Sequence, residues 1–331
     1  MSLKEQLLLI DPEGESARIV SQLQEQVRKV MRRQGGVVGI SGGVDSSVVL
    51  ALCVRAFGPE RVIPVMMPEK DSDPETEKLS RMVAQHFGVE PVLEDISPAL
   101  EGFGCYQRRD EAVRRLFPEY EAEAGYKVKI VLPQNLLDQD TLNIFSLTVV
   151  SPDGKEFTQR LPLREYFQIV AASNFKQRTR MSMLYYHAEL NNYAVIGTAN
   201  KNEHDQGFFV KYGDGGVDIQ PVVHLFKTQI YQLAEYLGVP QEIRLRPPTT
   251  DTYSAPSTQE EFFFRLPFET MDLLWVAQEK GLPIETVASE MGLSEEQVLR
   301  AYRDFLRKQR TTDYLRMPVV SLRNEGPEAS A

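Results

Sequence analysis

A seven-residue loop between two apolar segments constrains the fold of this chain more than any other feature. The loop spans residues 41–47 and reads Ser-Gly-Gly-Val-Asp-Ser-Ser, with an apolar run at 35–40 before it and another at 48–54 after it. This order predicts a buried strand, a tight turn and a helix. The paired glycines let the backbone approach a ligand closely, and the helix N-terminus offers unpaired N–H groups to an anion. The segment therefore predicts a phosphate-binding loop.

The acidic residue in this loop distinguishes it from the common mononucleotide-binding loop. No Lys-Ser or Lys-Thr pair follows the glycines, and Asp45 and Ser46 stand in that place. A carboxylate beside a polyphosphate is favourable only if a metal ion lies between them. An ordinary glycine turn that opens a helix would explain the two glycines, but it would leave Asp45 and the hydroxyl groups without a role.

Strand and helix patterns alternate around the loop. Short apolar segments typical of buried strands lie at 37–40, 62–67, 92–96 and 193–197. Helical patterns lie at 16–33, 44–57, 74–87 and 175–190. The repeated order of strand, helix and strand predicts an α/β fold, in which helices cover both faces of a parallel sheet.

Two regions depart from this alternation. Between about 100 and 165 the chain is polar and aromatic, and the turn signal Ser-Pro-Asp-Gly at 151–154 separates the alternating segments 143–150 and 156–161, which predicts a β-hairpin in an insertion. From about 265 onward three helical patterns follow, and the last opens with Ser294 and Gln297 as a capping box.

These patterns predict a domain organisation. We expect an α/β domain over residues 1–265 with the insertion at about 100–165. Residues 266–331 are expected to form a helical extension of the same domain, with a disordered tail at 320–331.

Composition and charge limit the class of protein. The chain has 331 residues and a formal net charge of −10, which disfavours a general affinity for nucleic acid or anionic membranes. It has only two cysteines, Cys53 and Cys105, so no disulfide framework is expected, and Cys53 in an apolar helix is read as a buried thiol. The N-terminal segment has too few consecutive apolar residues for a signal peptide, and no apolar run of about 18 residues occurs, so we expect a cytoplasmic protein.

A second series of motifs begins at the predicted strand 193–197. Gly197 and Thr198 end this strand, Glu203 lies five residues beyond Thr198, and Lys-Tyr-Gly-Asp-Gly-Gly follows at 211–216. Asp218 and a Lys-x-Gln helix start at 227–229 come next. The helix before the strand carries Asn-x-x-x-Arg-x-Arg-Met at 174–181, and Arg-Pro-Pro-Thr-Thr-Asp lies downstream at 246–251.

In this order and at these spacings, the motifs resemble the NAD synthetase family, over roughly residues 15–98 and 165–310. The loop at 41–47 resembles the pyrophosphate-binding loop of the ATP pyrophosphatase superfamily, to which that family belongs. The resemblance implies a Rossmann-like fold of the adenine nucleotide alpha hydrolase type and the ammonia-dependent amidation of deamido-NAD to NAD. It also implies ATP as co-substrate, Mg²⁺ as the metal, and a homodimer.

The resemblance assigns residues to each ligand. The residues implied to contact ATP are Gly39, Ile40, Ser41, Gly42, Gly43, Val44, Asp45, Ser46, Thr198, Lys227 and Thr249. The residues implied to bind deamido-NAD are Arg178, Lys211 and Asp218. The implied metal ligands are Asp45 and Glu203, and the residues implied to act in catalysis are Asp45, Lys211 and Lys227.

The chemistry of amidation explains why such residues are needed. Ammonia does not displace oxide from a carboxylate, so the carboxylate must first attack the α phosphorus of ATP to form an acyl-adenylate, which ammonia then cleaves. The first step builds negative charge on the departing pyrophosphate. Hard carboxylate oxygens from Asp45 and Glu203 suit a Mg²⁺ ion at this position, and Lys227 would stabilise the same charge.

Other functions explain less of the sequence. The family's C-terminal His-Lys pair is missing, and the nearest basic run is at 307–310, so a related ligase that amidates another carboxylic acid is the main alternative. The segment 284–298 followed by basic residues is superficially similar to a helix-turn-helix, which would imply DNA binding. A catalytically silent nucleotide sensor is a third alternative. The paired catalytic cysteines of tRNA thiolation enzymes and a glutaminase nucleophile are not found, so free ammonia is the implied nitrogen donor.

Overall fold

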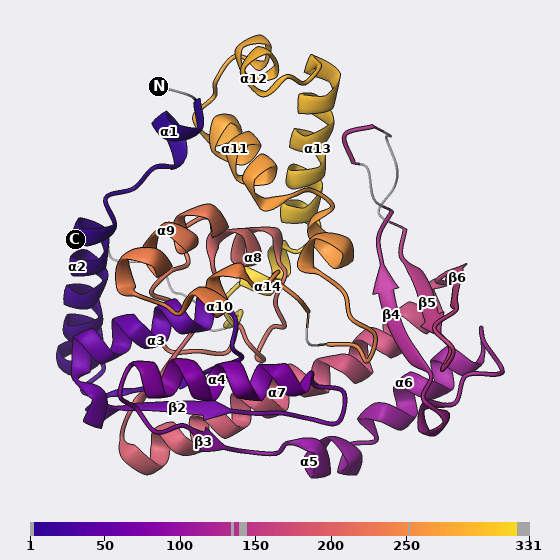
Figure 1. The fold of residues 1–331 in the computed structure, drawn as a ribbon, viewed down its shortest axis with the longest axis horizontal. Helices are drawn as coiled ribbons and strands as arrows, with labels where there is room; N and C mark the ends of the chain where they lie inside the picture. Colours follow the sequence, from indigo (N-terminus) through magenta and orange to yellow (C-terminus); the bar gives the residue numbers. More distant parts are fainter. Residues whose placement is uncertain (1–2, 134–135, 139–143, 251, 323–331) are drawn as a thin grey trace.

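The computed structural model describes residues 3–133, 136–138, 144–250 and 252–322 and contains a four-stranded parallel sheet, of which Figure 1 labels β2 and β3. Its strand order is β3-β2-β1-β7. The strands are β1 (Gly36–Gly39), β2 (Val62–Met66), β3 (Val92–Leu93) and β7 (Ala194–Ile196). The predicted parallel α/β sheet is confirmed, although β3 is shorter than the predicted segment 92–96.

Helices cover both faces of this sheet. One face carries α2 (Pro12–Leu23), which continues as a π-helix at Gln24–Val30, together with α3 (Val44–Phe57), α4 (Pro74–His86), α9 (Lys227–Leu237) and α10 (Gln241–Leu245). The opposite face carries α5 (Ser97–Gly102) and α7 (Leu163–Asn191). Neighbouring side chains of a strand point to opposite faces, so Val38 packs in the first layer and Val37 in the second.

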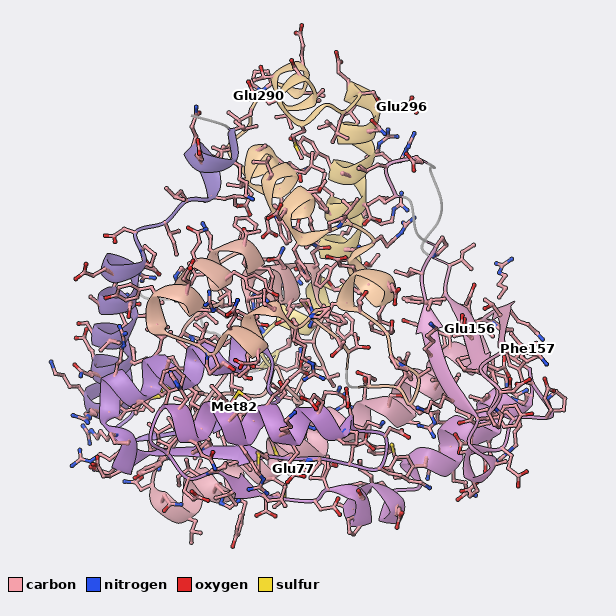
Figure 2. The ribbon with its side chains drawn as sticks, in the orientation of Figure 1. Glu77, Met82, Glu156, Phe157, Glu290 and Glu296 are labelled. Atoms are coloured by element: carbon pink, nitrogen blue, oxygen red, sulfur yellow. The ribbon has the colours of Figure 1, made fainter. Side chains whose placement is uncertain are left out.

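The predicted insertion forms a small layer of its own. Its antiparallel sheet has the order β4-β5-β6, with β4 at Lys127–Val131, β5 at Ser146–Val150 and β6 at Glu156–Arg160. The predicted hairpin is confirmed by β5 and β6, although residue 143 lies outside the described residues. Figure 2 labels Glu156 and Phe157 on the outer strand β6, whose residues are all exposed. The sequence patterns did not reveal β4, the short helical turn Ala122–Ala124 or helix α6 (Cys105–Arg114).

A buried group of charges joins the insertion to the central sheet. We call it the Lys176 cluster, and its members are Glu69, Asp71, Arg109, Asp110 and Lys176. The Nζ atom of Lys176 on α7 donates to Glu69 Oε1 at 2.7 Å, to Asp71 Oδ2 at 2.8 Å and to the Thr252 carbonyl at 2.9 Å. Arg109 on α6 pairs with Asp71 and with Asp110. The cluster therefore fixes the loop after β2 between α6 and α7.

The C-terminal helices form a further core. Helix α11 (Phe268–Glu279), α12 (Ile284–Met291) and α13 (Glu295–Thr311) pack together with the π-helical turn Glu260–Phe264, and α1 (Leu3–Leu8) lies against α11. The predicted capping box of Ser294 and Gln297 opens α13. Figure 2 labels Glu290 and Glu296 at the outer end of this group. The division of the chain near residue 265 stays a prediction. Within the described ranges, no helix is long and apolar enough to span a membrane.

Candidate active site

The predicted phosphate-binding loop connects the end of β1 to the start of α3. Gly42 has a φ of +65°, a backbone conformation that favours glycine, and a Cβ atom there would lie 2.7 Å from the Cβ of Leu79 on α4. The Ser41 N–H points toward Ser46 Oγ at 3.4 Å, and Ser46 Oγ donates to the Gly43 carbonyl at 3.1 Å. The sequence therefore predicted the strand, the turn and the helix start correctly.

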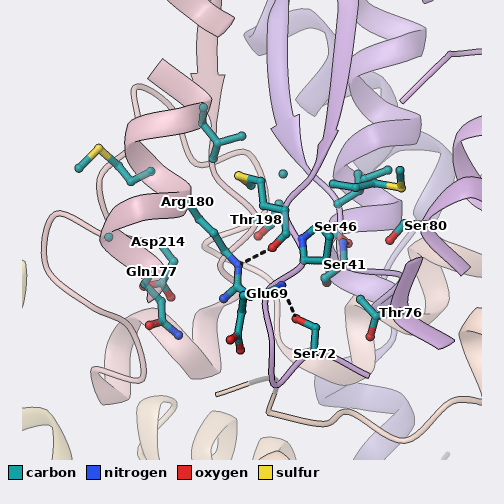
Figure 3. Close-up of a pocket in the computed structure, with 18 of the residues that line it drawn as sticks. Ser41, Ser46, Glu69, Ser72, Thr76, Ser80, Gln177, Arg180, Thr198 and Asp214 are labelled. Carbon is teal, nitrogen blue, oxygen red and sulfur yellow. Dashed lines mark hydrogen bonds between the residues drawn. The ribbon is translucent and has the colours of Figure 1, made fainter. Parts of the chain in front are cut away.

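Two cavities meet at this loop. The larger has a volume of about 480 Å³ and lies between the ends of β1 and β2, α4 and α7 (Figure 3). The smaller has a volume of about 150 Å³ and contains Asp45, Glu203, Lys227 and Thr249 in its wall. The residues that line both cavities are Ser41, Ser46, Thr76 and Thr198. The larger volume suits a small organic ligand, and the smaller one suits a polar group attached to it.

One face of α7 forms a wall of the larger cavity. Gln177, Arg180, Met181 and Leu184 line it at helical spacing, and Figure 3 labels Gln177 and Arg180 there. The Arg180 Nε donates to the Met67 carbonyl at the end of β2 at 3.2 Å. The resemblance assigned no role to Arg180, but the helical period that places Gln177 and Leu184 on this face would have placed Arg180 there too.

Buried polar atoms in the cavity walls lack a partner. Among the described residues, Ser80 Oγ and Gln177 Oε1 in the larger cavity and Gln259 Oε1 in the smaller one make no hydrogen bond to the protein. Burying a polar atom without a partner is costly, so such atoms are expected to bond to a ligand or to water. The residues that carry these atoms line the two cavities, and the atoms themselves are buried.

The smaller cavity brings the two predicted metal ligands and the predicted catalytic lysine together. The buried Nζ atom of Lys227, at the start of α9, forms a short ion pair with Asp45 Oδ2. Glu203 lies in the first turn of α8 (Lys201–Gln206), and its Oε1 accepts from Gln259 Nε2 at 3.2 Å. No group of three or more side chains able to ligate a metal occurs in the described part of the chain. Two carboxylates still fit Mg²⁺, which usually takes its remaining ligands from phosphate oxygens and water.

The ionisation of these groups depends on burial and on one another. Burial is the main cause that raises the pKa of Glu203 from 4.5 to about 8, and the negative charge of Asp45 adds to it. Burial alone would lower the pKa of Lys227, but the carboxylates of Asp45 and Glu203 outweigh it and raise that pKa. With its pKa near 8, Glu203 keeps a proton at neutral pH, and a bound cation would favour the charged form of Glu203.

Two asparagines that sequence reasoning missed hold this arrangement in place. Asn200 Nδ2 donates to Asp45 Oδ1 at 2.9 Å, while its Oδ1 accepts from the Glu203 N–H at 3.0 Å. Asn202 Oδ1 accepts from the Lys227 N–H at 2.8 Å. Asn200 and Glu203 have the spacing of a capping box, which is a signal in the sequence. Asn202 has no comparable local signal.

The three residues implied to bind deamido-NAD lie outside both cavities. Arg178 Nη2 contacts the Lys211 carbonyl at 3.4 Å, and Lys211 Nζ donates to the carbonyls of Tyr314 and Met317 at 2.9 and 2.8 Å. Asp218 accepts from Tyr185 Oη at 3.0 Å and from the Val195 N–H at 2.8 Å. The structure therefore places Arg178 beside Lys211 but does not bring Lys211 to Asp45 and Lys227.

The raised pKa of Glu203 predicts a dependence of stability on pH. Between 4.5 and about 8 the folded protein keeps a proton that the unfolded chain has released, so its free energy of unfolding falls as the pH rises through this range. We expect Glu203→Gln to remove this part of the slope, whereas Glu290→Gln, on an exposed turn of α12, should keep it. Urea denaturation in the presence of a chelator at several pH values measures the difference. Parallel curves for the wild type and Glu203→Gln would contradict it.

The fold and these cavities define an α/β protein with a candidate ligand-binding site at the loop 41–47. Comparison with known proteins identifies the family within this class. The family model described as NAD synthase matches residues 15–124 and 133–311. This range includes most of the segment 100–165 that the sequence analysis set apart from the resemblance. The chain therefore belongs to the NAD synthase family, as the sequence motifs predicted.

Several relatives are named NH(3)-dependent NAD(+) synthetase. The one from Mesorhizobium japonicum is 50% identical over 317 residues, which cover 96% of this chain and 98% of that protein. The one from Thermotoga maritima is 35% identical over 263 residues, covering 80% and 86%. Among solved structures, an NH3-dependent NAD synthetase from Campylobacter jejuni superposes with a TM-score of 0.60 at 21% identity, covering 94% of this chain and 100% of that one. This last similarity confirms the predicted fold alone.

Proposed function

We propose that this chain is a ligase that amidates deamido-NAD to NAD with ammonia and ATP, through an acyl-adenylate, and releases AMP and pyrophosphate. The observation that carries the proposal is the smaller cavity, where the loop at 41–47, which carries Asp45, lies against Glu203 and Lys227. The family and the names of the relatives agree with ATP as co-substrate. A cytoplasmic location remains part of the prediction.

The residues of the two cavities support a division of the ATP molecule between them. The larger cavity fits the adenosine, with Gly39 and Ile40 in its wall, and the smaller fits the pyrophosphate. Ser41, Ser46 and Thr198 border both, so they would lie beside the α phosphate. Thr249 also lines the smaller cavity and would contact the phosphates there.

Each bond that breaks in the reaction leaves charge on a phosphate. A carboxylate oxygen of deamido-NAD attacks the α phosphorus, and the bond from that phosphorus to the pyrophosphate oxygen breaks. Ammonia then attacks the acyl carbon, AMP departs with the bridging oxygen, and a proton is lost to give the amide. Lys227 and the loop N–H groups would stabilise the pyrophosphate, while Asp45 and Glu203 would hold Mg²⁺, which supplies positive charge to the same oxygens.

The residues implied to bind the acceptor, deamido-NAD, lie on the surface of the chain and not in a cavity. Arg178 and Lys211 lie together at a partly exposed position. Helix α7 also exposes large apolar side chains, namely Leu163, Phe167, Tyr186 and Leu190. A second copy of the chain that covers this face would complete a site for deamido-NAD, so we propose a homodimer. Light scattering at micromolar concentration tests it, and a monomer would count against it.

DNA binding is less well supported by the same fold. Lys308, within the basic run of the helix-turn-helix-like segment, is buried, pairs with Asp304 at 2.9 Å and donates to the Phe263 carbonyl at 2.8 Å. Arg300 bonds to the Leu137 carbonyl and to Glu296. Because Lys308 and Arg300 make these contacts within the protein, they hold α13 in place and are not free to contact DNA.

A comparison of acceptor acids tests the proposed function. Deamido-NAD, nicotinate mononucleotide and nicotinate are each supplied with ATP, Mg²⁺ and ammonium, and both the amide and AMP are measured. We expect deamido-NAD to have the highest kcat/KM, by at least about tenfold, because binding of its remote adenylate half helps to position the carboxylate. Glutamine in place of ammonium should give no product. Equal kcat/KM for the three acids would favour the related ligase over the NAD synthetase.

A further inference from the structure

The loop that carries Thr249 also brings an unassigned arginine to the smaller cavity. Arg246 precedes Pro247 and Pro248, and it lines the cavity together with Asp45, Glu203 and Lys227. The loop is fixed at its far end, because the Gln259 N–H donates to the Pro248 carbonyl at 3.0 Å and the Thr250 N–H donates to the Ser257 carbonyl at 2.9 Å. Arg246, Thr249 and Gln259 thus reach the cavity from one closed loop.

The ionisable side chains of the smaller cavity favour a further positive charge when a polyphosphate binds. Its ionisable side chains are Asp45, Glu203, Lys227 and Arg246. Lys227 is already paired with Asp45. A Mg²⁺ ion held by Asp45 and Glu203 would neutralise only part of the charge of a pyrophosphate group, so this cavity still favours a further cation beside Lys227. Arg246 is the other basic residue among those that line the smaller cavity.

The present partners of Arg246 hold it only weakly. Its Nη2 atom lies 3.2 Å from Asp73 Oδ2 and 3.4 Å from Thr76 Oγ1, on the first turn of α4. The side chain of Asp73 is 57% exposed, whereas that of Arg246 is 18% exposed. An ion pair with a well-hydrated carboxylate contributes little, but a guanidinium can bind a phosphate through two parallel hydrogen bonds. Thr76, which touches Arg246, itself borders both cavities.

We propose that Arg246 is a phosphate-binding residue of this site, which exchanges Asp73 for the β and γ phosphates of ATP and then for the pyrophosphate product. The proposal rests on the proposed function, because it assumes that a polyphosphate occupies the smaller cavity. Arg246 would act on binding and on the charge of the leaving group, beside Lys227.

Binding of magnesium pyrophosphate and of magnesium ATP without any acceptor, measured by calorimetry, tests the proposal on the full chain. Arg246→Met should weaken both by about 10- to 100-fold, the loss expected for a hydrogen bond to a charged group. Arg246→Lys should recover part of the affinity, because the charge remains but the paired donors are lost. Arg244→Met is the matched control, since Arg244 lies two residues away and bonds to the Val239 carbonyl outside the cavity.

Asp73→Asn separates ligand binding from a structural role. Asp73 accepts from the Glu75 N–H at 3.0 Å as the N-cap of α4, and asparagine is an equally good cap. If Arg246 binds phosphate, Asp73→Asn should leave pyrophosphate affinity unchanged or increase it. Equal losses in Asp73→Asn and Arg246→Met would show that Arg246 only ties the loop to α4, and would overturn the proposal, as would unchanged binding in Arg246→Met. If the wild type binds neither ligand, the proposed function itself fails.

Discussion

Replacing Asp45 with asparagine is expected to lower kcat by about 10²–10³-fold, the size of effect seen when one preorganised electrostatic contact to a developing charge is lost. Asp45 contacts Lys227 and Asn200 and lies in the wall of the smaller cavity with Glu203. Asparagine keeps the shape of the side chain but removes the charge that would hold the metal. Steady-state turnover at saturating ATP, deamido-NAD and Mg²⁺ measures the loss.

The control for this experiment is a carboxylate far from the site. Asp153→Asn changes an exposed side chain in the hairpin of the insertion and should leave turnover unchanged. Thermal unfolding of both variants checks that each is folded. Turnover of Asp45→Asn close to that of the wild type at saturating Mg²⁺ would remove Asp45 from the mechanism.

Lys176→Met is expected to lower the free energy of unfolding by about 3–5 kcal/mol, the cost of removing one partner from a buried ion pair. The side chains of Lys176 and Glu69 are 1% and 0% exposed, so the carboxylates of the Lys176 cluster would lose a partner without gaining water. The positive charges of Lys176 and Arg109 lower the pKa of Asp71 against the effect of burial, so this group is held in its charged form. Urea denaturation measures the change.

An exposed ion pair provides the comparison for Lys176. Lys155 pairs with Asp153 at 2.7 Å, but their side chains are 72% and 56% exposed. Lys155→Met should therefore change the free energy of unfolding by less than about 1 kcal/mol. The double variant Lys176→Met with Glu69→Gln should be less destabilised than the sum of the two single variants, because it leaves one fewer unpaired charge. A loss in Lys176→Met no larger than that in Lys155→Met would contradict a stabilising role for the cluster.

Local signals made much of the fold predictable. The apolar runs around residues 41–47 predicted the positions of β1 and α3, and the predicted helix 44–57 matches α3 from end to end. The turn signal at 151–154 predicted the hairpin that β5 and β6 form. Helix α7 was predicted to begin near 175 but begins at Leu163, since its first turns expose Leu163 and Phe167 and bury Glu165, and so they lack a clear apolar face. β4 pairs with β5 across a long connection, and such pairing leaves little trace in a short alternating segment.

The site was predictable to the extent that its residues lie in short motifs. Asp45, Glu203, Lys227 and Thr249 come from four separate segments, and each was identified from its motif before the structure brought them into one cavity. Asp272 was missed because its role depends on tertiary contact alone: its carboxylate accepts from Asn202 Nδ2 at 2.5 Å and from the Thr228 N–H at 2.9 Å, from a different helix. Arg246 belonged to a quoted motif, but only the packing of its loop shows that it faces the phosphates' proposed position.

The fate of the carboxylate oxygen tests the central claim most directly. Deamido-NAD labelled with ¹⁸O in its nicotinate carboxylate is converted with unlabelled ATP, Mg²⁺ and ammonium, and the products are analysed by mass spectrometry. Because the carboxylate attacks the α phosphorus and AMP later departs with the bridging oxygen, one ¹⁸O atom should appear in each AMP and none in the pyrophosphate. Formation of ADP with ¹⁸O in inorganic phosphate, or of AMP without label, would contradict an acyl-adenylate made at this site.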